Sequence, residues 1–218
     1  MRHLPVTLLL ALVSPIAGWA HPHVFVDTGI ELITDESGKL TQVKVTWAYD
    51  AFYSLLITED MGLDPDGDMV LTEAEQSELT GFDANWDPGF AGDLVARLGG
   101  GDLTLSRPIA PTAQMREGRI ITTHQRDVAE QPNLAGETLT LLPYDPTYYT
   151  AYDVTLPVTV TGAAECDVAL TPPKMDDALS EMQDKLLAVD AAEDPAELGL
   201  GDMGRAFATE VRITCAGG

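Results

Sequence analysis

Short β-type segments separated by turn signals are the feature that most constrains this fold. The first two, His23–Ile33 and Leu40–Trp47, are rich in Val, Ile and Phe and flank an Asp-Glu-Ser-Gly turn, which predicts a β-hairpin. Many short strands and few helices predict a mainly β (α+β) chain with a β-sandwich-like domain. The further strand-like runs are 94–98, 103–105, 114–115, 120–124, 138–142, 154–160, 166–170 and 207–215.

Two helical regions are expected to interrupt this β pattern. Asp50 is a favourable N-cap, apolar residues follow it at helical spacing, and a short polar helix should end near Leu79. Residues 50–80 are therefore expected to form an inserted helix-loop-helix resembling an EF-hand. Apolar spacing over 176–189 predicts a C-terminal helix, and the acidic, glycine-containing stretch 191–204 predicts a loop.

The first twenty residues have the layout of a Sec-type signal peptide. Arg2 precedes an apolar run over 4–13, and small residues lead to Ala20. That run is shorter than the ~20 residues that a membrane-spanning helix needs. Cleavage after Ala20 would leave 21–218 as a single periplasmic domain. No later segment is apolar enough to span a bilayer, so no membrane insertion of the mature chain is expected.

The charge balance restricts the partners that this chain can have. Its 12 basic and 35 acidic residues give a net charge of −23. A field of this sign repels nucleic acid and anionic lipid and concentrates cations. We therefore expect no nucleic-acid partner, and we interpret most of the carboxylates as a solvated surface.

Two cysteines, Cys166 and Cys215, occur in a chain that is expected to be exported. An even number of cysteines in an oxidising compartment predicts one disulfide. A thiolate metal site would be the alternative, but the sequence has neither a CxxC pair nor a histidine near these cysteines.

The candidate metal site lies where the mature chain would begin. There His21 would offer its α-amine and a ring nitrogen, and His23 would follow at strand spacing. Pro22 lacks an N–H, so the square-planar chelate that uses deprotonated backbone amides cannot form in its usual way. Nitrogen ligands suit zinc, nickel, cobalt or copper. In the alternative interpretation the two histidines merely begin an edge strand. The candidate ligands are His21, His23, Asp27, Asp50 and Asp145.

The position of His124 distinguishes a metal-binding protein from a copper enzyme. It lies in a strand-like run and is interpreted as a hydrogen-bonded structural histidine. Copper oxidative enzymes instead use an N-terminal histidine brace whose second histidine is distant in sequence. If His124 lay beside His21, this enzymatic alternative would gain support.

An acidic loop has the ligand spacing of an EF-hand. Asp64, Asp66 and Asp68 occupy positions 1, 3 and 5. Position 6 should be glycine for a sharp turn but is Met69, which weakens the expected Ca²⁺ affinity. We predict a calcium-binding or formerly calcium-binding loop with a structural role. Its later positions 7, 9 and 12 are Val70, Thr72 and Glu75.

A tyrosine-rich stretch over 144–152 contains an Asp-Pro turn and predicts a turn followed by an aromatic strand that packs on the sheet. Within it, Asp145 is either a metal carboxylate or the cap of an Asx-type turn.

These stretches together carry a family resemblance. In order they are His21-Pro22-His23-Val24-Phe25-Val26-Asp27, Trp47-Ala48-Tyr49-Asp50-Ala51-Phe52-Tyr53-Ser54, the acidic loop and Tyr144-Asp145-Pro146-Thr147-Tyr148-Tyr149. The mature chain resembles, over nearly its whole length, a bacterial family of unknown function that is described as the periplasmic component of an uncharacterised ABC-type transport system. Its members are often encoded beside nickel/cobalt-type permeases or zinc-homeostasis genes. The resemblance implies periplasmic metal handling with a membrane metal permease as partner.

The function expected from the sequence is a non-catalytic periplasmic metal-binding protein that assists or buffers for a metal transporter. The alternatives are a copper-dependent oxidative enzyme and a Ca²⁺-stabilised structural or adaptor domain. No Ser/His/Asp or Cys/His nucleophile set and no phosphate-cradling glycine motif is evident.

Overall fold

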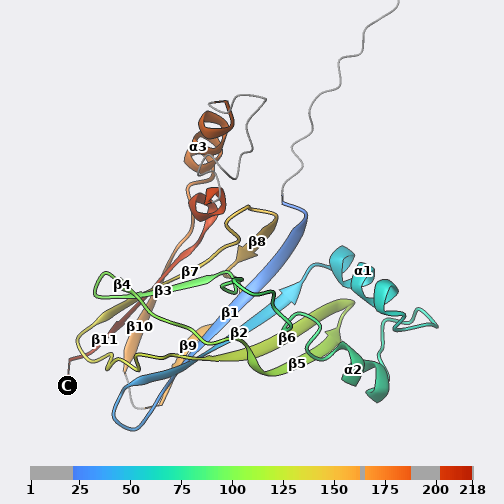
Figure 1. Cartoon of the computed structure of the whole chain (residues 1–218), viewed down its shortest axis with the longest axis horizontal. Helices are drawn as coiled ribbons and strands as arrows, with labels where there is room; N and C mark the ends of the chain where they lie inside the picture. Colours follow the sequence, from blue (N-terminus) through green and yellow to red (C-terminus); the bar gives the residue numbers. More distant parts are fainter. Residues whose placement is uncertain (1–21, 163–164, 188–201, 218) are drawn as a thin grey trace, which may run out of the picture.

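Two β-sheets share one hydrophobic core in the computed structural model, which describes residues 22–162, 165–187 and 202–217 (Figure 1). The first sheet has the order β5-β6-β2-β1-β8, with β9 also paired to β1, and the second has the order β10-β11-β7-β3-β4. This architecture confirms the predicted β-sandwich-like α+β fold. The strands are β1 (Val24–Thr34), β2 (Leu40–Tyr49), β3 (Leu94–Leu98), β4 (Gly101–Asp102), β5 (Ile109–Arg116), β6 (Arg119–Asp127), β7 (Thr138–Pro143), β8 (Thr150–Asp153), β9 (Val158–Thr161), β10 (Cys166–Thr171) and β11 (Glu210–Cys215).

The β1–β2 hairpin forms as its turn chemistry predicts. The Asp35 carboxylate accepts hydrogen bonds from the backbone N–H groups of Ser37 at 2.8 Å and Lys39 at 3.0 Å. Gly38 adopts a φ of 79°, a conformation that glycine reaches without a steric penalty. The other edge of β1 pairs in parallel with β8 near its start and with β9 near its end. β1 is therefore an interior strand of the first sheet.

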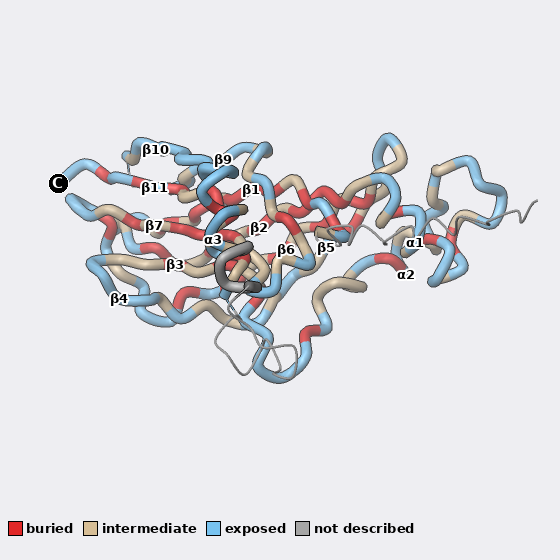
Figure 2. Tube along the Cα trace, turned by 90° about the horizontal axis from the view of Figure 1, so that it is seen from above, coloured by how far each residue is buried: buried red, intermediate tan, exposed pale blue. Residues whose placement is uncertain are grey.

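The core lies between the two sheets, where the buried residues form a band through the middle of the molecule (Figure 2). Each of the two sheets contributes side chains from alternate strand positions, as the period of two requires. Full burial of one such side chain stabilises the fold by about 1.5–3 kcal/mol. Fully buried examples are Ile30 and Leu32 of β1, Leu139 and Leu141 of β7, and Ile213 of β11.

The helices are α1 (Ala51–Met61), α2 (Glu73–Leu79), α3 (Met175–Leu187) and the 3-10 helix η1 (Met203–Phe207). Asp50 caps α1 as predicted, with its carboxylate accepting from the Tyr53 N–H at 2.8 Å. Thr72 and Glu75 form a capping box at the start of α2, and fully buried Leu79 anchors its end. Figure 1 places α1 and α2 together at one end of the first sheet, away from α3.

Three segments differ from the sequence-based expectation. The final strand begins at Glu210, because the preceding residues form η1, in which Phe207 stacks on Tyr148 at 3.9 Å. Residues 103–108 cross from β4 of the second sheet to β5 of the first, and Leu105 makes only a single bridge to Val128. Within 154–160, only the part from Val158 joins a sheet. Each difference follows from tertiary contacts that local patterns do not encode.

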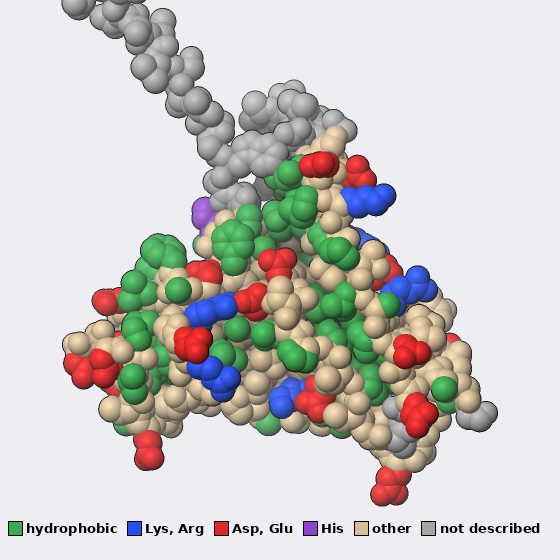
Figure 3. Space-filling view, turned by 180° about the vertical axis from the view of Figure 1, so that it is seen from behind, with side chains coloured by type: hydrophobic (Ala, Val, Ile, Leu, Met, Phe, Trp, Pro, Cys, Tyr) green, Lys and Arg blue, Asp and Glu red, His purple; other side chains and the backbone are tan. Residues whose placement is uncertain are grey.

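The predicted disulfide between Cys166 and Cys215 is confirmed, and it joins facing residues of β10 and β11. A disulfide is consistent with an exported protein. Among the helices that the structure describes, none is long and apolar enough to cross a membrane. On the face shown in Figure 3, acidic side chains are scattered among hydrophobic and basic ones.

Candidate functional site

His23 lies exposed at the point where the chain enters β1. Its backbone N–H donates to the Tyr149 carbonyl at 2.8 Å, and the two side-chain rings lie 4.8 Å apart. The next residue, Val24, opens the parallel pairing with β8 opposite Thr150. The tyrosine-rich segment thus forms a turn followed by a strand that packs beside β1, as predicted. It holds the backbone of His23 in a defined position.

Asp50 connects β1 to α1. Its Oδ2 accepts from the Phe25 N–H at 2.9 Å, while its Oδ1 accepts from the Tyr53 N–H at 2.8 Å. Both carboxylate oxygens therefore have backbone donors.

Asp27 and Asp145 are also engaged by the protein. Asp27 forms a salt bridge with Arg119 at 2.7 Å and accepts from the Thr155 hydroxyl. Burial acts to raise the pKa of Asp27, but these contacts outweigh it and hold that pKa below its usual value. Asp145 Oδ1 accepts from the Thr147 N–H at 2.8 Å, and its Oδ2 accepts from the Thr150 N–H at 3.0 Å. This pattern is that of an Asx-type turn.

The candidate ligands at the start of β1 are not gathered into one cluster by the part of the chain that the structure describes. Within residues 22–162, 165–187 and 202–217, the one group of three acidic, histidine or cysteine ligand atoms that fits a metal ion is elsewhere, in the acidic loop. His21, which would supply two nitrogens, lies outside the described residues. The terminal metal site therefore stays a prediction.

The acidic loop brings its first three carboxylates together. One ligand atom from each of Asp64, Asp66 and Asp68 lies within 4.8 Å of the others. The pKa of Asp66 is raised, chiefly by the charge of Asp68. Like charges at this separation repel each other, and a bound cation would relieve that repulsion.

The loop backbone adopts a sharp turn despite the missing glycine. Met69 has a φ of 61°, and its N–H donates to Asp64 Oδ2 at 2.9 Å. Glu75, at loop position 12, accepts from the N–H groups of Asp64 at 3.2 Å and Thr72 at 2.7 Å. The strain expected from a side chain at position 6 is thus present at Met69.

A polar cluster inside the sandwich was not anticipated from the sequence. Asp83 Oδ2 accepts from the Tyr49 hydroxyl at 2.9 Å and from the Thr122 hydroxyl at 2.5 Å. Burial raises the pKa of Asp83, although these two hydrogen bonds oppose that effect. Nearby, the Tyr152 hydroxyl donates to Asp93 at 2.9 Å, and burial raises the pKa of Asp93 to about 7.

His124 lies in the same interior region with only 2% of its surface exposed. Its ring packs at 4.7 Å from Trp47 and 5.4 Å from Trp86. The predicted structural role fits this burial, but its Nε2 atom has no hydrogen-bond partner among the described residues. Burial, together with the charge of Arg126, lowers the pKa of His124 to about 4, so the ring is neutral at pH 7.

His124 and the start of β1 lie far apart. His124 is level with Val45 of β2, which is level with Ile30 of β1, seven residues beyond His23. At about 3.3 Å per residue, this separation is on the order of 20 Å along the sheet. His124 therefore does not lie beside His23.

One sequence signal could have indicated the interior cluster. In β6 the alternate positions Ile120, Thr122, His124 and Arg126 are all buried. Three of these four inward-facing residues are polar or ionisable, which is unusual for a core face. The period of two in the sequence 119–127 therefore pointed to a polar interior, although its partners Asp83 and Asp93 are remote in sequence.

Together, the fold and these sites define an α+β protein of two sheets with an acidic helix-flanked loop and a polar interior. The chain belongs to the DUF1007 family, described as a protein of unknown function, whose family model matches residues 6–215. A comparison with curated proteins finds no match. The family match supports the resemblance to a family of unknown function.

Proposed function

We propose that this chain is a non-catalytic, exported metal-binding protein that assists or buffers for a membrane metal permease of an ABC-type transport system. In this proposal the imidazoles of His21 and His23, with the α-amine of a chain beginning at His21, bind zinc, nickel, cobalt or copper in the periplasm. The observation that carries it is the exposed position of His23 on a backbone fixed by Tyr149.

In this proposal the atoms that bind the metal are nitrogens and not carboxylate oxygens. Asp27, Asp50 and Asp145 already accept hydrogen bonds or a salt bridge, and each would have to release a partner to bind a metal. An N-terminal histidine offers a chelate from a single residue, and a second imidazole two residues later adds to it. Such donors suit late first-row metals. The backbone bond from His23 to Tyr149 reduces the conformational freedom lost on binding.

An exposed aromatic surface adjoins His23 and suits contact with a partner. Tyr149, whose ring lies 4.8 Å from that of His23, and Phe25 are each 49% exposed. Exposed apolar groups that lie close together mark protein interaction sites. We assign this surface to the permease.

The enzymatic alternative receives less support. A brace needs its second histidine at the metal, whereas His124 is enclosed between Trp47 and Trp86, on the order of 20 Å from His23 along the sheet.

The test is a titration of Zn²⁺, Ni²⁺, Co²⁺ and Cu²⁺ into chain confirmed by mass to begin at His21. Tight binding that is lost in His21→Ala/His23→Ala is the expected result. A matched control carries one alanine ahead of His21, which keeps both imidazoles but moves the α-amine, and it should bind more weakly than the native terminus. Equal binding by all three proteins, or no binding by the native chain, would reject the proposal.

A second candidate function is Ca²⁺ binding by the acidic loop, with a stabilising role. It is favoured by the convergence of the Asp64, Asp66 and Asp68 carboxylates between α1 and α2. Ca²⁺ should then raise the melting temperature of the native chain but not that of Asp64→Asn. A Ca²⁺ effect of equal size in both would exclude the loop.

A further inference from the structure

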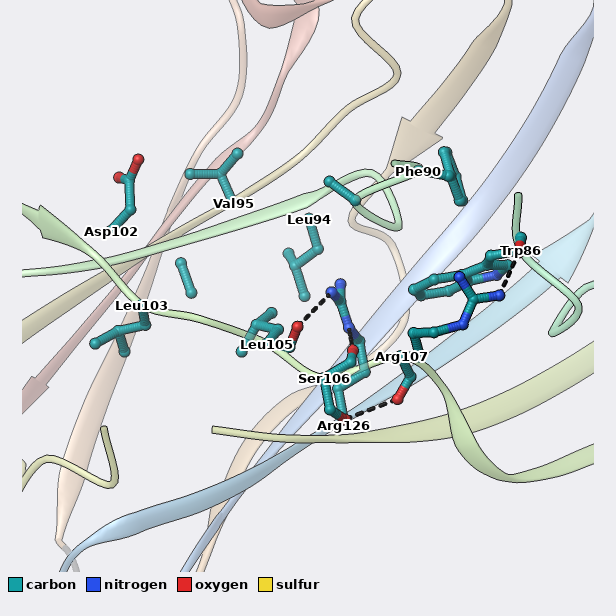
Figure 4. A pocket seen from close by; sticks show the side chains of 12 residues that line it. Trp86, Phe90, Leu94, Val95, Asp102, Leu103, Leu105, Ser106, Arg107 and Arg126 are labelled. Carbon is teal, nitrogen blue, oxygen red and sulfur yellow. Dashed lines mark hydrogen bonds between the residues drawn. The ribbon is translucent and has the colours of Figure 1, made fainter. Parts of the chain in front are cut away.

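A hollow of about 250 Å³ opens beside β3. We call it the Arg126 hollow. It is lined by residues of β3, of the segment that follows β4 and of the 86–91 loop, and by Arg126 of β6. Figure 4 shows the Arg126 guanidinium between Leu105 on one side and the Trp86 ring, with Arg107 beside it, on the other. The lining of the hollow includes Trp86, Phe90, Leu94, Leu105, Arg107 and Arg126.

Arg126 is a buried cation with an unused donor. Only 4% of the residue is exposed, and its Nε and Nη2 donate to the carbonyls of Ser106 at 2.7 Å and Leu105 at 3.3 Å. Its Nη1 has no hydrogen-bond partner among the described residues. Burial lowers its pKa to about 10, so the guanidinium remains charged at neutral pH.

No carboxylate hydrogen-bonds to this guanidinium in the described part of the chain. The charge of Asp93 acts on Arg126 against the effect of burial, but the Asp93 carboxyl accepts a hydrogen bond from the Tyr152 hydroxyl at 2.9 Å. Asp102 also lines the hollow but is paired with Arg97 at 2.5 Å. Buried charges are normally paired, because an isolated one is costly. The hollow therefore presents a positive charge suited to an anion.

The backbone is shaped to hold this cation. Arg126 Cζ lies 5.0 Å from the Trp86 ring centroid, a cation–π contact. Gly92, with a φ of 78°, lies against both side chains, and a Cβ there would come within 2.3 Å of Trp86 and 2.8 Å of Arg126 Nη1. Any larger residue would displace the indole or the guanidinium. Glycine is thus required for the seating of Arg126.

We propose that the Arg126 hollow binds a small monocarboxylate with an apolar body. The Arg126 guanidinium supplies the charge that holds the carboxylate, and the body packs against Leu94, Leu105 and Phe90. At about 30 Å³ per water-sized group, the hollow holds on the order of eight non-hydrogen atoms, the size of hexanoate or benzoate. Arg107 also lines the hollow, is exposed, and attracts the anion against the negative field of the protein. This proposal is independent of the metal proposal.

The test compares hexanoate and benzoate with their neutral amides, by calorimetric titration of the full mature chain. We expect saturable binding of the acids and at least tenfold weaker binding of the amides, because the charge-assisted bond is lost. Inorganic phosphate, which has the charge but no apolar body, should also bind at least tenfold more weakly.

Two variants address the site itself. Arg126→Gln should weaken hexanoate binding at least tenfold. Since this variant leaves backbone acceptors unpaired and could fail to fold, Ala91→Trp provides a second test, because it fills the hollow from an exposed residue of the lining while Arg126 is kept. Arg212→Gln on β11 removes an equal charge from an exposed residue that does not line the hollow, and it should bind as the native chain does.

The proposal is overturned if the native chain shows no saturable binding of either acid. It is also overturned if the amides or phosphate bind as tightly as the acids, or if Ala91→Trp binds hexanoate with unchanged affinity.

Discussion

Phe25 and Asp50 hold each other through two hydrogen bonds of opposite direction. The Phe25 N–H donates to Asp50 Oδ2 at 2.9 Å, and the Asp50 N–H donates to the Phe25 carbonyl at 2.9 Å. Because the other carboxylate oxygen caps α1 through Tyr53, one side chain positions both the entry to β1 and the first helix. The exposed aromatic surface beside His23 depends on this junction.

Asp50→Ala should therefore destabilise the protein. Loss of an N-cap costs about 1 kcal/mol, and the unpaired Phe25 N–H adds to that. We expect a decrease of roughly 1–2 kcal/mol in the free energy of unfolding, measured by urea denaturation. Asp50→Asn keeps one acceptor oxygen and should lose less stability than the alanine variant. A loss below about 0.5 kcal/mol in Asp50→Ala would contradict this account.

Asp93 makes stability depend on pH in an unusual direction. Its pKa is raised from 3.8 to about 7 by burial, so the folded state binds the extra proton between these values. The stabilisation is fully present below pH 4 and is lost as pH rises to about 7. Asp93→Asn does not titrate, and asparagine keeps an acceptor for Tyr152.

The stability of Asp93→Asn relative to the native chain should consequently rise between pH 4 and pH 7, by up to about 1.4 kcal/mol per pH unit. Denaturant unfolding at several pH values measures this difference. Asp87→Asn, at an exposed position, is the control. A pH-independent difference for Asp93→Asn would show that its carboxyl is not protonated in the folded state.

His124 makes the stability of the protein depend on pH in the opposite direction to Asp93. Its pKa is lowered from 6.5 to about 4, so the unfolded state binds more protons between these values. Its contribution to stability is full above pH 6.5 and is lost as pH falls towards 4. His124→Leu should remove this loss, and its stability relative to the native chain should rise by up to about 1.4 kcal/mol per unit of acidification. His23→Ala, a change at an exposed position, serves as the control. If His124→Leu and the native chain lose stability equally on acidification, the prediction is refuted.

The disulfide closes a long loop. Cys166 and Cys215 are separated by 49 residues, for which the chain-entropy relation gives roughly 4 kcal/mol of stabilisation. The Cys166→Ala/Cys215→Ala chain should be less stable by about 2–4 kcal/mol in urea. Adding reductant to the native chain should produce a similar loss, which separates the effect of the bond from that of the buried thiol volume. An unchanged midpoint in both measurements would count against a role in stability.

The strain at Met69 can be tested through Ca²⁺. Glycine adopts positive φ without the cost of about 1 kcal/mol that a side chain carries, so Met69→Gly should bind Ca²⁺ about fivefold more tightly if the loop is a calcium site. The neighbouring Val70→Gly, which relieves no positive φ, is the matched control. Titration followed by thermal shift distinguishes the two. Equal affinities would mean that position 6 does not limit binding.

Local chemistry explains which parts of this fold were predictable. The hairpin turn at Asp35, the N-cap at Asp50 and the cysteine pair are specified by residues close in sequence or by a count, and all three were predicted. The parallel pairing of β1 with β8 and β9 has no local signal, because its register depends on residues over a hundred positions apart.

Whether a site could be predicted also depends on how close its residues are in the sequence. The convergence of Asp64, Asp66 and Asp68 follows from spacing within one loop. The interior cluster joins Asp83, Tyr49 and Thr122 from separate elements, and the seating of Arg126 depends on Gly92 in a distant loop. Only the polar residues at alternate positions of β6 indicated this polar interior from the sequence. The terminal site centred on His21 stays a prediction.

The central position of β1 has a consequence for the order of folding. Val24 belongs to the earliest part of the described chain to be synthesised, yet its partner Thr150 follows after most of both sheets has been made. Until then one edge of β1 is an unpaired row of backbone donors and acceptors next to exposed aromatic side chains. A newly made chain therefore spends most of its synthesis with this strand open to pairing with other chains. Chaperone protection of this first strand would matter more to the yield of folded protein than protection of any later one.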